Sequence, residues 1–286
     1  MMGAAVAPIL AAVLAGGCAP ISKKHQVPPG QMRPAMEASA DQLIAKYNEQ
    51  ARAVKSLRAS VTLAPTAGSA YSGVIEEYHN FNGFILAQRP AHIRVIGQAP
   101  VVAKNIFDMV SDGETFRIFI PSKNKFIVGP ASLQRPAKKP IENLRPQHLL
   151  EALFWPEIRA GQHVLFEELD EPPARYYVLT LLRETSAGPE IARKIWFDRA
   201  DLSVARVQIY EGHGKVASDV RYADWQMTAD VRYPRDIFLA RPQDDYKLEI
   251  KITQLALNEE ISADRFHLEQ PAGTELVRVG EGEEKK

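Results

Sequence analysis

The sequence of 286 residues has very little of several features that define common classes of protein. It has one cysteine, so it can form neither an internal disulfide nor a CxxC zinc or redox site. Its 35 Lys and Arg residues match its 35 Asp and Glu residues, which leaves no excess of positive charge for nucleic acid. It also lacks the GxGxxG and GxxxxGKS/T loops of nucleotide-binding folds. What remains is an ordinary globular composition, 45% hydrophobic and 24% charged.

Motifs that would indicate catalysis are missing as well. The histidines are scattered, none forms HExxH, and there is no GxSxG nucleophile turn. Glu76-Glu77, Glu167-Glu168 and Asp244-Asp245 are adjacent carboxylates, but neighbours on a strand point to opposite faces and make poor acid–base pairs. We therefore predict no catalytic residue, no metal site and no cofactor, and we expect that the protein is not an enzyme.

The single cysteine stands at the end of an uncharged N-terminal stretch. Residues 4–17 are almost all small or apolar; they have the length of the apolar region of a secretory signal and are too few to span a bilayer. They lead into Leu14-Ala15-Gly16-Gly17-Cys18, which resembles the bacterial lipobox, where cleavage precedes the cysteine and its thiol receives lipid. We expect a signal peptide over residues 1–17 and a lipidated, palmitate-bearing Cys18. The alternative, a buried helix with an inert thiol, suits Pro8 and the glycine pair badly.

A polar, proline-containing tether is expected over residues 18–37. An extended tether of this length reaches roughly 50 Å, at about 3.1 Å per residue. Ala19 follows the cysteine, in place of the aspartate that holds one group of bacterial lipoproteins at the inner membrane. We therefore expect a lipid-anchored envelope protein at the periplasmic face of the outer membrane. A folded domain should follow over residues 38–278, and a charged tail over residues 279–286.

An amphipathic helix is predicted at the start of that domain, from Ala40 to about Ser56. Ser39 and Gln42 form a capping-box signature. The apolar residues beyond them recur at helical spacing and share one face. They are Leu43, Ile44, Tyr47, Ala51 and Val54. The helix should bury this stripe against the rest of the domain.

The remainder of the domain is predicted to be mostly strand. Short strands separated by turn signals such as Asp112-Gly113 indicate an antiparallel meander. The predicted strands cover residues 57–64, 73–79, 83–88, 92–96, 106–111, 115–120, 125–128, 163–169, 176–183, 193–198, 205–211, 217–225, 236–240 and 246–257. Some of them, such as 176–182, are apolar on both faces and need cover on both. A sheet of this many strands usually curls or closes.

A proline-rich, basic segment from Gly129 to Pro146 divides two blocks of strands. Residues 147–154 follow it and predict a short apolar helix that stops before Pro156. We expect this part to form a loop and a lid over one mouth of a single barrel-like domain.

Three features, in this order along the chain, resemble the LolA and LolB group of lipoprotein carriers and receptors. Arg89-Pro90 matches the pair that closes one strand in that group, and residues 110–116, Val-Ser-Asp-Gly-Glu-Thr-Phe, match its turn between the next two strands. Residues 264–273 match its closing segment, which runs from a phenylalanine to Pro-x-Gly. The resemblance covers about residues 38–277.

The resemblance implies an incomplete antiparallel β-barrel with a helical lid in its concave side, an apolar cavity for acyl chains, and no catalysis. The carriers are soluble and the receptor is lipid-anchored, so Cys18 places this chain nearer the receptor. The functional arginine of the carriers corresponds to Arg89, which would bind a lid helix or a ligand head group. The alternative is a rim arginine that caps a strand end.

Aromatic side chains are the other candidates for lining such a cavity. The predicted ligand-binding residues are Arg89, Tyr47, Phe84, Phe107, Phe116 and Trp196, with Trp155 as a further aromatic of the same set. For any one aromatic residue a dry core is the commoner place, so the prediction concerns the set.

Two functions from different classes follow. The first is binding of acyl chains or lipoproteins, for lipid or lipoprotein transport or insertion at the outer membrane. An acyl chain costs about 0.8 kcal/mol per CH₂ in water, so it crosses an aqueous compartment only inside an apolar cavity. The second is a structural or sensory envelope lipoprotein that binds a protein partner through the same curved sheet. A cavity beyond ~300 Å³ favours the first, and a filled core with an exposed apolar patch favours the second.

Overall fold

Alternation of buried and exposed residues along the strands builds one large curved sheet. Strand β14 (Tyr246–Leu257) shows the pattern clearly, because Tyr246, Leu248, Ile250 and Ile252 are buried and the residues between them are exposed. Such a strand turns one face to the core and the other to solvent.

The computed structural model describes residues 34–69, 73–100, 104–132, 145–171 and 174–280. The chain from Pro34 onward is one compact unit. The predicted signal peptide, Cys18 and most of the predicted tether lie outside the described residues. So do residues 133–144 of the predicted loop and most of the predicted tail.

The described residues contribute fifteen strands to this sheet. Besides β14 they are β1 (Ser56–Ser69), β2 (Val74–Glu77), β3 (Phe81–Gln88), β4 (His92–Gln98), β5 (Asn105–Ser111), β6 (Thr115–Ile120), β7 (Lys125–Pro130), β8 (Val164–Glu171), β9 (Ala174–Thr185), β10 (Gly188–Asp198), β11 (Val204–Tyr210), β12 (Val216–Thr228), β13 (Val231–Arg241) and β15 (Glu275–Arg278).

The order of the strands shows how the sheet stays open. It runs β15-β7-β6-β5-β4-β3-β1-β14-β13-β12-β11-β10-β9-β8, and β2 pairs with β1 off this path. Neighbours in the order are antiparallel, such as the central pair β1 and β14, except that β15 lies parallel to β7. Within the described part of the chain the end strands β15 and β8 do not pair with each other. The predicted incomplete antiparallel barrel is confirmed, and β15 is a strand that the sequence pattern does not predict.

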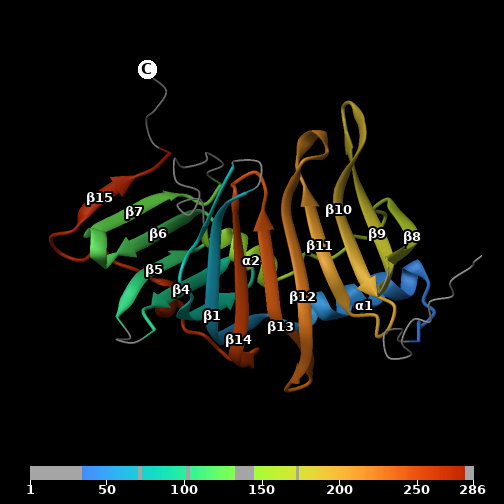
Figure 1. Cartoon of the computed structure of the whole chain (residues 1–286), viewed down its shortest axis with the longest axis horizontal. Helices are drawn as coiled ribbons and strands as arrows, with labels where there is room; N and C mark the ends of the chain where they lie inside the picture. Colours follow the sequence, from blue (N-terminus) through green and yellow to red (C-terminus); the bar gives the residue numbers. More distant parts are fainter. Residues whose placement is uncertain (1–33, 70–72, 101–103, 133–144, 172–173, 281–286) are drawn as a thin grey trace, which may run out of the picture. The chain divides into compact units, whose positions relative to one another are not determined.

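Both helices lie on one face of the sheet, behind the strands in Figure 1. α1 (Ala40–Ala53) begins at the predicted capping box, in which the side chains of Ser39 and Gln42 each accept a hydrogen bond from the other's backbone N–H. It ends slightly before the predicted end, because Val54 is extended and β1 follows at once. α2 (Pro146–Leu153) is the predicted short apolar helix. In the described residues, neither helix has the length and apolar character needed to cross a membrane.

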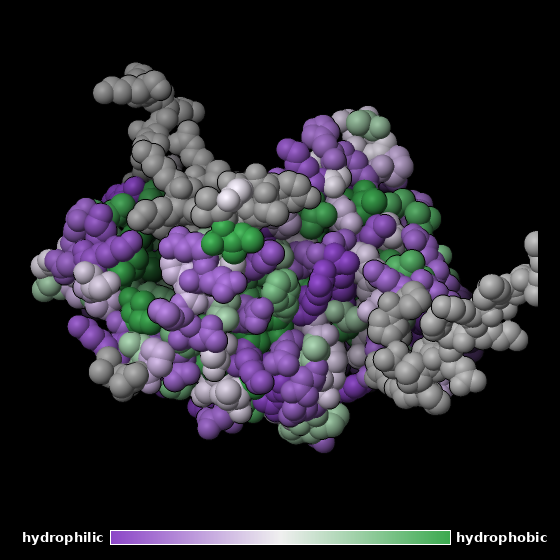
Figure 2. Space-filling view, viewed as in Figure 1, coloured by the Kyte–Doolittle hydropathy of each residue, from purple (hydrophilic) through white to green (hydrophobic). Residues whose placement is uncertain are grey.

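The helices and the concave face of the sheet share one hydrophobic core. Leu43 and Tyr47 of α1 and Leu149 of α2 are fully buried in it, together with inward residues from distant strands such as Ile93 on β4 and Phe197 on β10. The opposite face, seen in Figure 2, is mainly hydrophilic with separate hydrophobic areas. The concave face is therefore where an apolar ligand would have to enter.

Candidate functional site

Arg89, directly after β3, ties the two helical elements together. Its Nε donates to the carbonyl of Val54 at 2.9 Å, and its Nη2 donates to the carbonyls of Ala51 and Trp155, each at 2.9 Å. Its guanidinium carbon lies 5.0 Å from the ring centroid of Phe154. One side chain thus links the C-terminal end of α1 to the segment that follows α2.

The Arg89-Pro90 pair and the Asp112-Gly113 turn, which are far apart in the sequence, lie against each other. Oδ1 of Asp112 accepts from two backbone N–H groups farther along the β5–β6 turn, at 2.9 and 2.8 Å. Gly113 has a φ of +95°, and a Cβ built there would lie 2.5 Å from the Cβ of Ala91. Because only glycine fits this contact, the turn packs directly against the strand end that carries Arg89.

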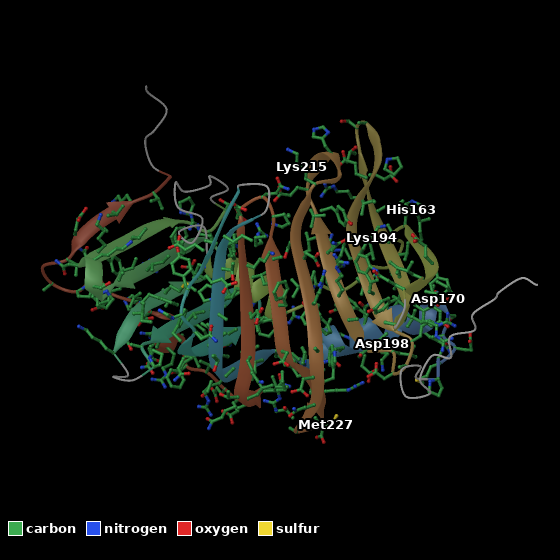
Figure 3. All side chains as sticks on the ribbon, in the orientation of Figure 1. His163, Asp170, Lys194, Asp198, Lys215 and Met227 are labelled. Carbon is green, nitrogen blue, oxygen red and sulfur yellow. The ribbon has the colours of Figure 1, made fainter. Side chains whose placement is uncertain are left out.

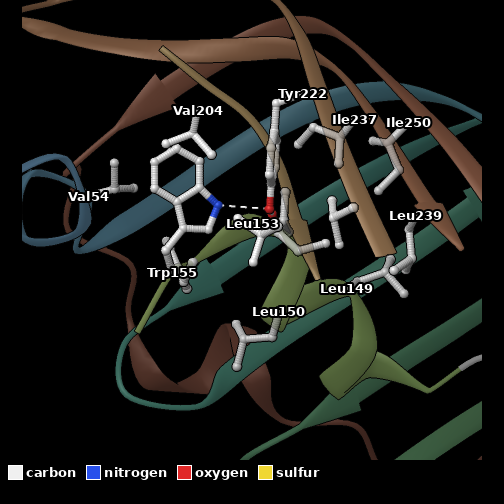
Figure 4. Packing of buried hydrophobic residues seen from close by; sticks show 14 of the residues in the cluster. Val54, Leu149, Leu150, Leu153, Trp155, Val204, Tyr222, Ile237, Leu239 and Ile250 are labelled. Atoms are coloured by element: carbon white, nitrogen blue, oxygen red, sulfur yellow. Dashed lines mark hydrogen bonds between the residues drawn. The ribbon is translucent and has the colours of Figure 1, made fainter. Parts of the chain in front are cut away.

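Residues 152–158, which we call the lid segment, are held by side chains from the sheet. The hydroxyl of Tyr222 donates to the carbonyl of Ala152 at 3.0 Å, and that of Tyr233 donates to the carbonyl of Leu153 at 2.8 Å. Nε1 of Trp155 donates in turn to the Tyr222 hydroxyl at 2.8 Å (Figure 4). These bonds satisfy backbone groups that would otherwise be unpaired in an apolar interior.

Arg193, on β10 in the other half of the sheet, binds the same segment. Its Nη1 donates to the hydroxyl of Tyr47 at 3.0 Å and to the carbonyl of Pro156 at 2.6 Å. Asn48 of α1 completes the attachment, because its side chain donates to the carbonyl of Ile158 at 2.9 Å and accepts from the N–H of that residue at 2.8 Å. Arg52 of α1 adds an exposed ion pair to Glu157 at 2.7 Å. The lid segment is therefore fastened by three arginines, two tyrosines and one asparagine.

The electrostatics of the site follow from burial. Burial raises the pKa of Tyr47 to about 12, although the charges of Arg193 and Arg89 oppose the shift. Burial also raises the pKa values of Tyr222 and Tyr233. It lowers the pKa of Arg89, and the charge of Glu157 opposes that change. The phenols therefore stay protonated and serve as hydrogen-bond donors.

Four of the predicted aromatic residues, Tyr47, Phe107, Phe116 and Trp155, lie on the concave side. Tyr47 is fully buried and stacks on Trp155 with a centroid distance of 5.7 Å. Phe107 packs against the core. Phe116 is buried, and the guanidinium of Arg145 lies 5.3 Å from its ring centroid.

The structure does not bring the other two to this face. Phe84 is 45% exposed, and its neighbour Ile85 is the residue that enters the core. Trp196 lies between Ile195 and Phe197, which belong to the core cluster while Trp196 does not. Period-2 alternation turns both side chains to the outer face. The ligand-binding role of the whole set stays a prediction.

Side chains fill most of the space between helices and sheet. A cavity of about 80 Å³ lies beside α1, and a second of about 10 Å³ borders Arg89. Both fall far below the roughly 300 Å³ at which ligand pockets usually begin. An acyl chain would fit only after the lid segment had moved. Among the described residues, no cluster of His, Cys, Asp and Glu could hold a metal ion.

Comparison with known proteins gives similarity at the level of structure. No family model matches the sequence, and no curated protein does either. A domain named for outer membrane lipoprotein sorting, from Vibrio parahaemolyticus, has a TM-score of 0.50 at 10% identity over 78% of this chain and 94% of its own. A LolA superfamily protein from Nitrosomonas europaea reaches 0.48 at 13% identity, over 81% and 99% of the two chains. A DUF1329 family protein from Desulfovibrio piger reaches 0.49 at 12% identity, over 78% and 94%.

The fold thus belongs to the class of incomplete antiparallel barrels that hold helices in their concave side. In particular, it is similar to the fold of the outer membrane lipoprotein-sorting domain from Vibrio parahaemolyticus. The resemblance found in the Arg-Pro and Ser-Asp-Gly motifs is confirmed at the level of the fold.

Proposed function

We propose that this protein is a lipid-anchored envelope protein that binds acyl chains or lipoproteins between its lid segment and its sheet. It would act as a carrier or receptor at the periplasmic face of the outer membrane, and not as an enzyme. The name of the Vibrio domain supports lipoprotein sorting as the class of function. The Cys18 motif supports the anchor.

The observation that carries the proposal is the set of hydrogen bonds made by Arg89. A carrier must hold its lid closed without making closure irreversible. Hydrogen bonds from a charged group contribute roughly 1.5–3 kcal/mol each, which acyl burial at about 0.8 kcal/mol per CH₂ can exceed. The filled interior then corresponds to the closed, ligand-free form.

Transfer of a fluorescent acyl probe tests the proposal. The full chain should bind the probe saturably and pass it to liposomes. Arg89→Leu should change the balance of open and closed forms, and we expect handover to suffer more than initial binding. Arg58→Leu is the matched control, because Arg58 is an exposed arginine on the outer face of β1.

The outcomes separate the protein's function from the role of one residue. A wild-type chain without saturable probe binding would overturn acyl binding. If the wild type binds the probe saturably and Arg89→Leu changes neither binding nor handover, only the role of Arg89 is disproved.

The anchor is tested separately. Cys18→Ser should leave an uncleaved precursor without lipid, because the thiol is the group that is acylated. Metabolic labelling with a radioactive fatty acid measures this. A mutant labelled as strongly as the wild type would disprove lipidation at Cys18.

Binding of a protein partner is the second candidate, and both the filled core and edge strand β8 favour it. Leu165, Phe166 and Leu169 are 54%, 40% and 39% exposed, and β8 ends the strand order. Such an edge can pair with a strand from another chain. Figure 3 labels Asp170 on the same strand. Leu165→Asp should abolish capture of a partner by this edge and leave acyl-probe binding unchanged. Partner capture that survives Leu165→Asp would oppose this candidate.

A further inference from the structure

The 80 Å³ cavity beside α1 combines apolar walls with positive charge. Tyr47 and Phe197 are among its apolar lining residues, and Lys46 and Arg232 are its charged ones. No Asp or Glu is part of the lining. The carboxylate of Asp201, which accepts from Arg232 at 2.7 Å, belongs to a residue outside the lining. The lining therefore contains two cationic side chains and no anionic one, and the charge of Arg232 is paired with Asp201 just outside it.

Trp225 lines the same cavity, and its indole N–H lies buried behind the lining. This N–H has no hydrogen-bond partner among the described residues. The groups around its ring are aromatic or cationic, with centroids of Trp155 and Tyr222 at 5.7 and 6.4 Å and the guanidinium of Arg232 at 5.7 Å. Buried donors are almost always paired, so an unpaired one indicates a missing acceptor.

Two further guanidinium groups extend the positive field to this cavity through Tyr47. Arg193 lies 5.5 Å from the Tyr47 ring centroid, and its hydrogen bonds go to the Tyr47 hydroxyl and to the carbonyls of Pro156 and Glu157. Arg89 likewise donates to carbonyls. Neither of these two guanidinium groups has a carboxylate among the hydrogen bonds described, although the charge of Glu157 acts on Arg89.

We propose that this cavity receives the anionic head group of an acyl ligand, a carboxylate or a phosphate, with Lys46, Arg232 and the Trp225 N–H as its contacts. The acyl chain would extend over the apolar concave face once the lid segment had moved. The proposal rests on the proposed acyl-binding function and adds the chemical class of the ligand to it. About 80 Å³ exceeds the roughly 10–15 Å³ of accessible volume that one water molecule needs, so the cavity has room for a small polar group.

Competition between matched lipids tests the head group. The full chain, loaded with a neutral fluorescent acyl probe, is titrated with palmitate against methyl palmitate, and with palmitoyl lysophosphatidate against monopalmitoylglycerol. Each pair differs in the charge of the head group and keeps the same acyl chain. We expect the anionic member of at least one pair to compete about tenfold better, and less so at high salt. The pair that shows the preference distinguishes a carboxylate from a phosphate.

Two variants tie the preference to this cavity. Trp225→Phe removes the N–H and keeps a ring, and Lys46→Gln removes an exposed charge with little risk to folding. Both should reduce the preference several-fold and leave competition by the neutral lipids unchanged. Lys55→Gln is the control, because Lys55 is an exposed lysine just after the same helix and lies outside the lining.

Each result decides between the two proposals. Saturable probe binding with equal competition by charged and neutral lipids, or a preference that Lys46→Gln and Trp225→Phe both leave intact, overturns the head-group site and leaves acyl binding standing. Failure of the chain to bind the probe at all overturns acyl binding, and the head-group site with it.

Discussion

Gly113 shows how a single residue sets the position of the site. Its positive φ and its contact with Ala91 allow the β5–β6 turn to pack against the strand end that carries Arg89. The sequence predicts the turn, because Asp-Gly between two strand patterns is typical of one. Only the three-dimensional structure shows that this turn contacts the Arg-Pro pair, more than twenty positions away in the chain.

We predict that Gly113→Ala destabilises the protein by about 1–3 kcal/mol, because the new Cβ adds backbone strain and a clash. The midpoint of urea unfolding measures this. Gly212→Ala is the control, since no atom lies within 4 Å of a Cβ built there. Equal unfolding midpoints for Gly113→Ala and the wild type would contradict the close contact.

His148 on α2 makes stability depend on pH. Burial, with the charges of Arg241 and Arg145, lowers its pKa from 6.5 to about 2. Between these values the unfolded chain binds a proton that the folded protein does not. This contribution to stability is therefore complete above pH 6.5 and is lost as the pH falls. The loss is up to about 1.4 kcal/mol per pH unit.

His148→Asn should remove this dependence while keeping an acceptor near the Tyr246 hydroxyl, which lies 2.6 Å from Nδ1 of the histidine. Urea unfolding at pH 7 and pH 5 should show the wild type losing about 2 kcal/mol more than the variant. Burial raises the pKa of Glu151 and acts in the opposite direction, but equally in both proteins. His79→Asn, at an exposed position, should behave like the wild type, and a variant with unchanged pH dependence would contradict a buried neutral His148.

At the scale of elements, α2 depends on its surroundings. It has eight residues, too few to be helical alone in water, and it buries Leu149, Leu150 and Leu153 against the sheet. Its apolar pattern and the following proline predict a short helix. What holds it in place comes from β4, β5, β12 and β13, and no local pattern contains that information.

Leu149→Ala should therefore cost about 2–5 kcal/mol and expose α2 first. Hydrogen exchange should show faster exchange in residues 146–158 than in the strands. Leu165→Ala on β8 deletes the same atoms at a position that is 54% exposed, so its effect should stay within about 1 kcal/mol. Uniform loss of protection across the sheet would show that the lid segment does not open separately.

In the molecule as a whole, several contacts join the two blocks of strands. β14 returns to pair with β1 from Leu57 to Ala67, β15 pairs with β7, and Tyr47 of α1 packs against Phe197 of β10. Each contact joins a strand or helix from before Gly129 to one from after Pro146.

A protease site inserted between Gly129 and Pro146 should therefore yield two fragments that remain associated after cleavage. Size exclusion and native mass spectrometry in non-denaturing buffer measure this, with the fragments in urea as the dissociated reference. Fragments that separate in native buffer and each melt cooperatively would refute a single domain.

Local patterns in the amino-acid sequence are enough to predict the local features. Ser39 with Gln42 predicts the start of α1, alternation predicts most of the strands, and Arg89-Pro90 with Ser111-Asp112-Gly113 identifies the fold, because capping, pleat and turn chemistry act over a few residues. Arg193 lies on the same face of its strand as the inward Ile195 and Phe197. From the sequence alone that face cannot be identified as the inward one, because Trp196 on the opposite face is also apolar. Only the tertiary structure decided that Arg193 binds the lid segment, that Phe84 and Trp196 face outward, and that β15 joins β7. These features depend on which distant strands meet, and local pattern carries no information about such pairings.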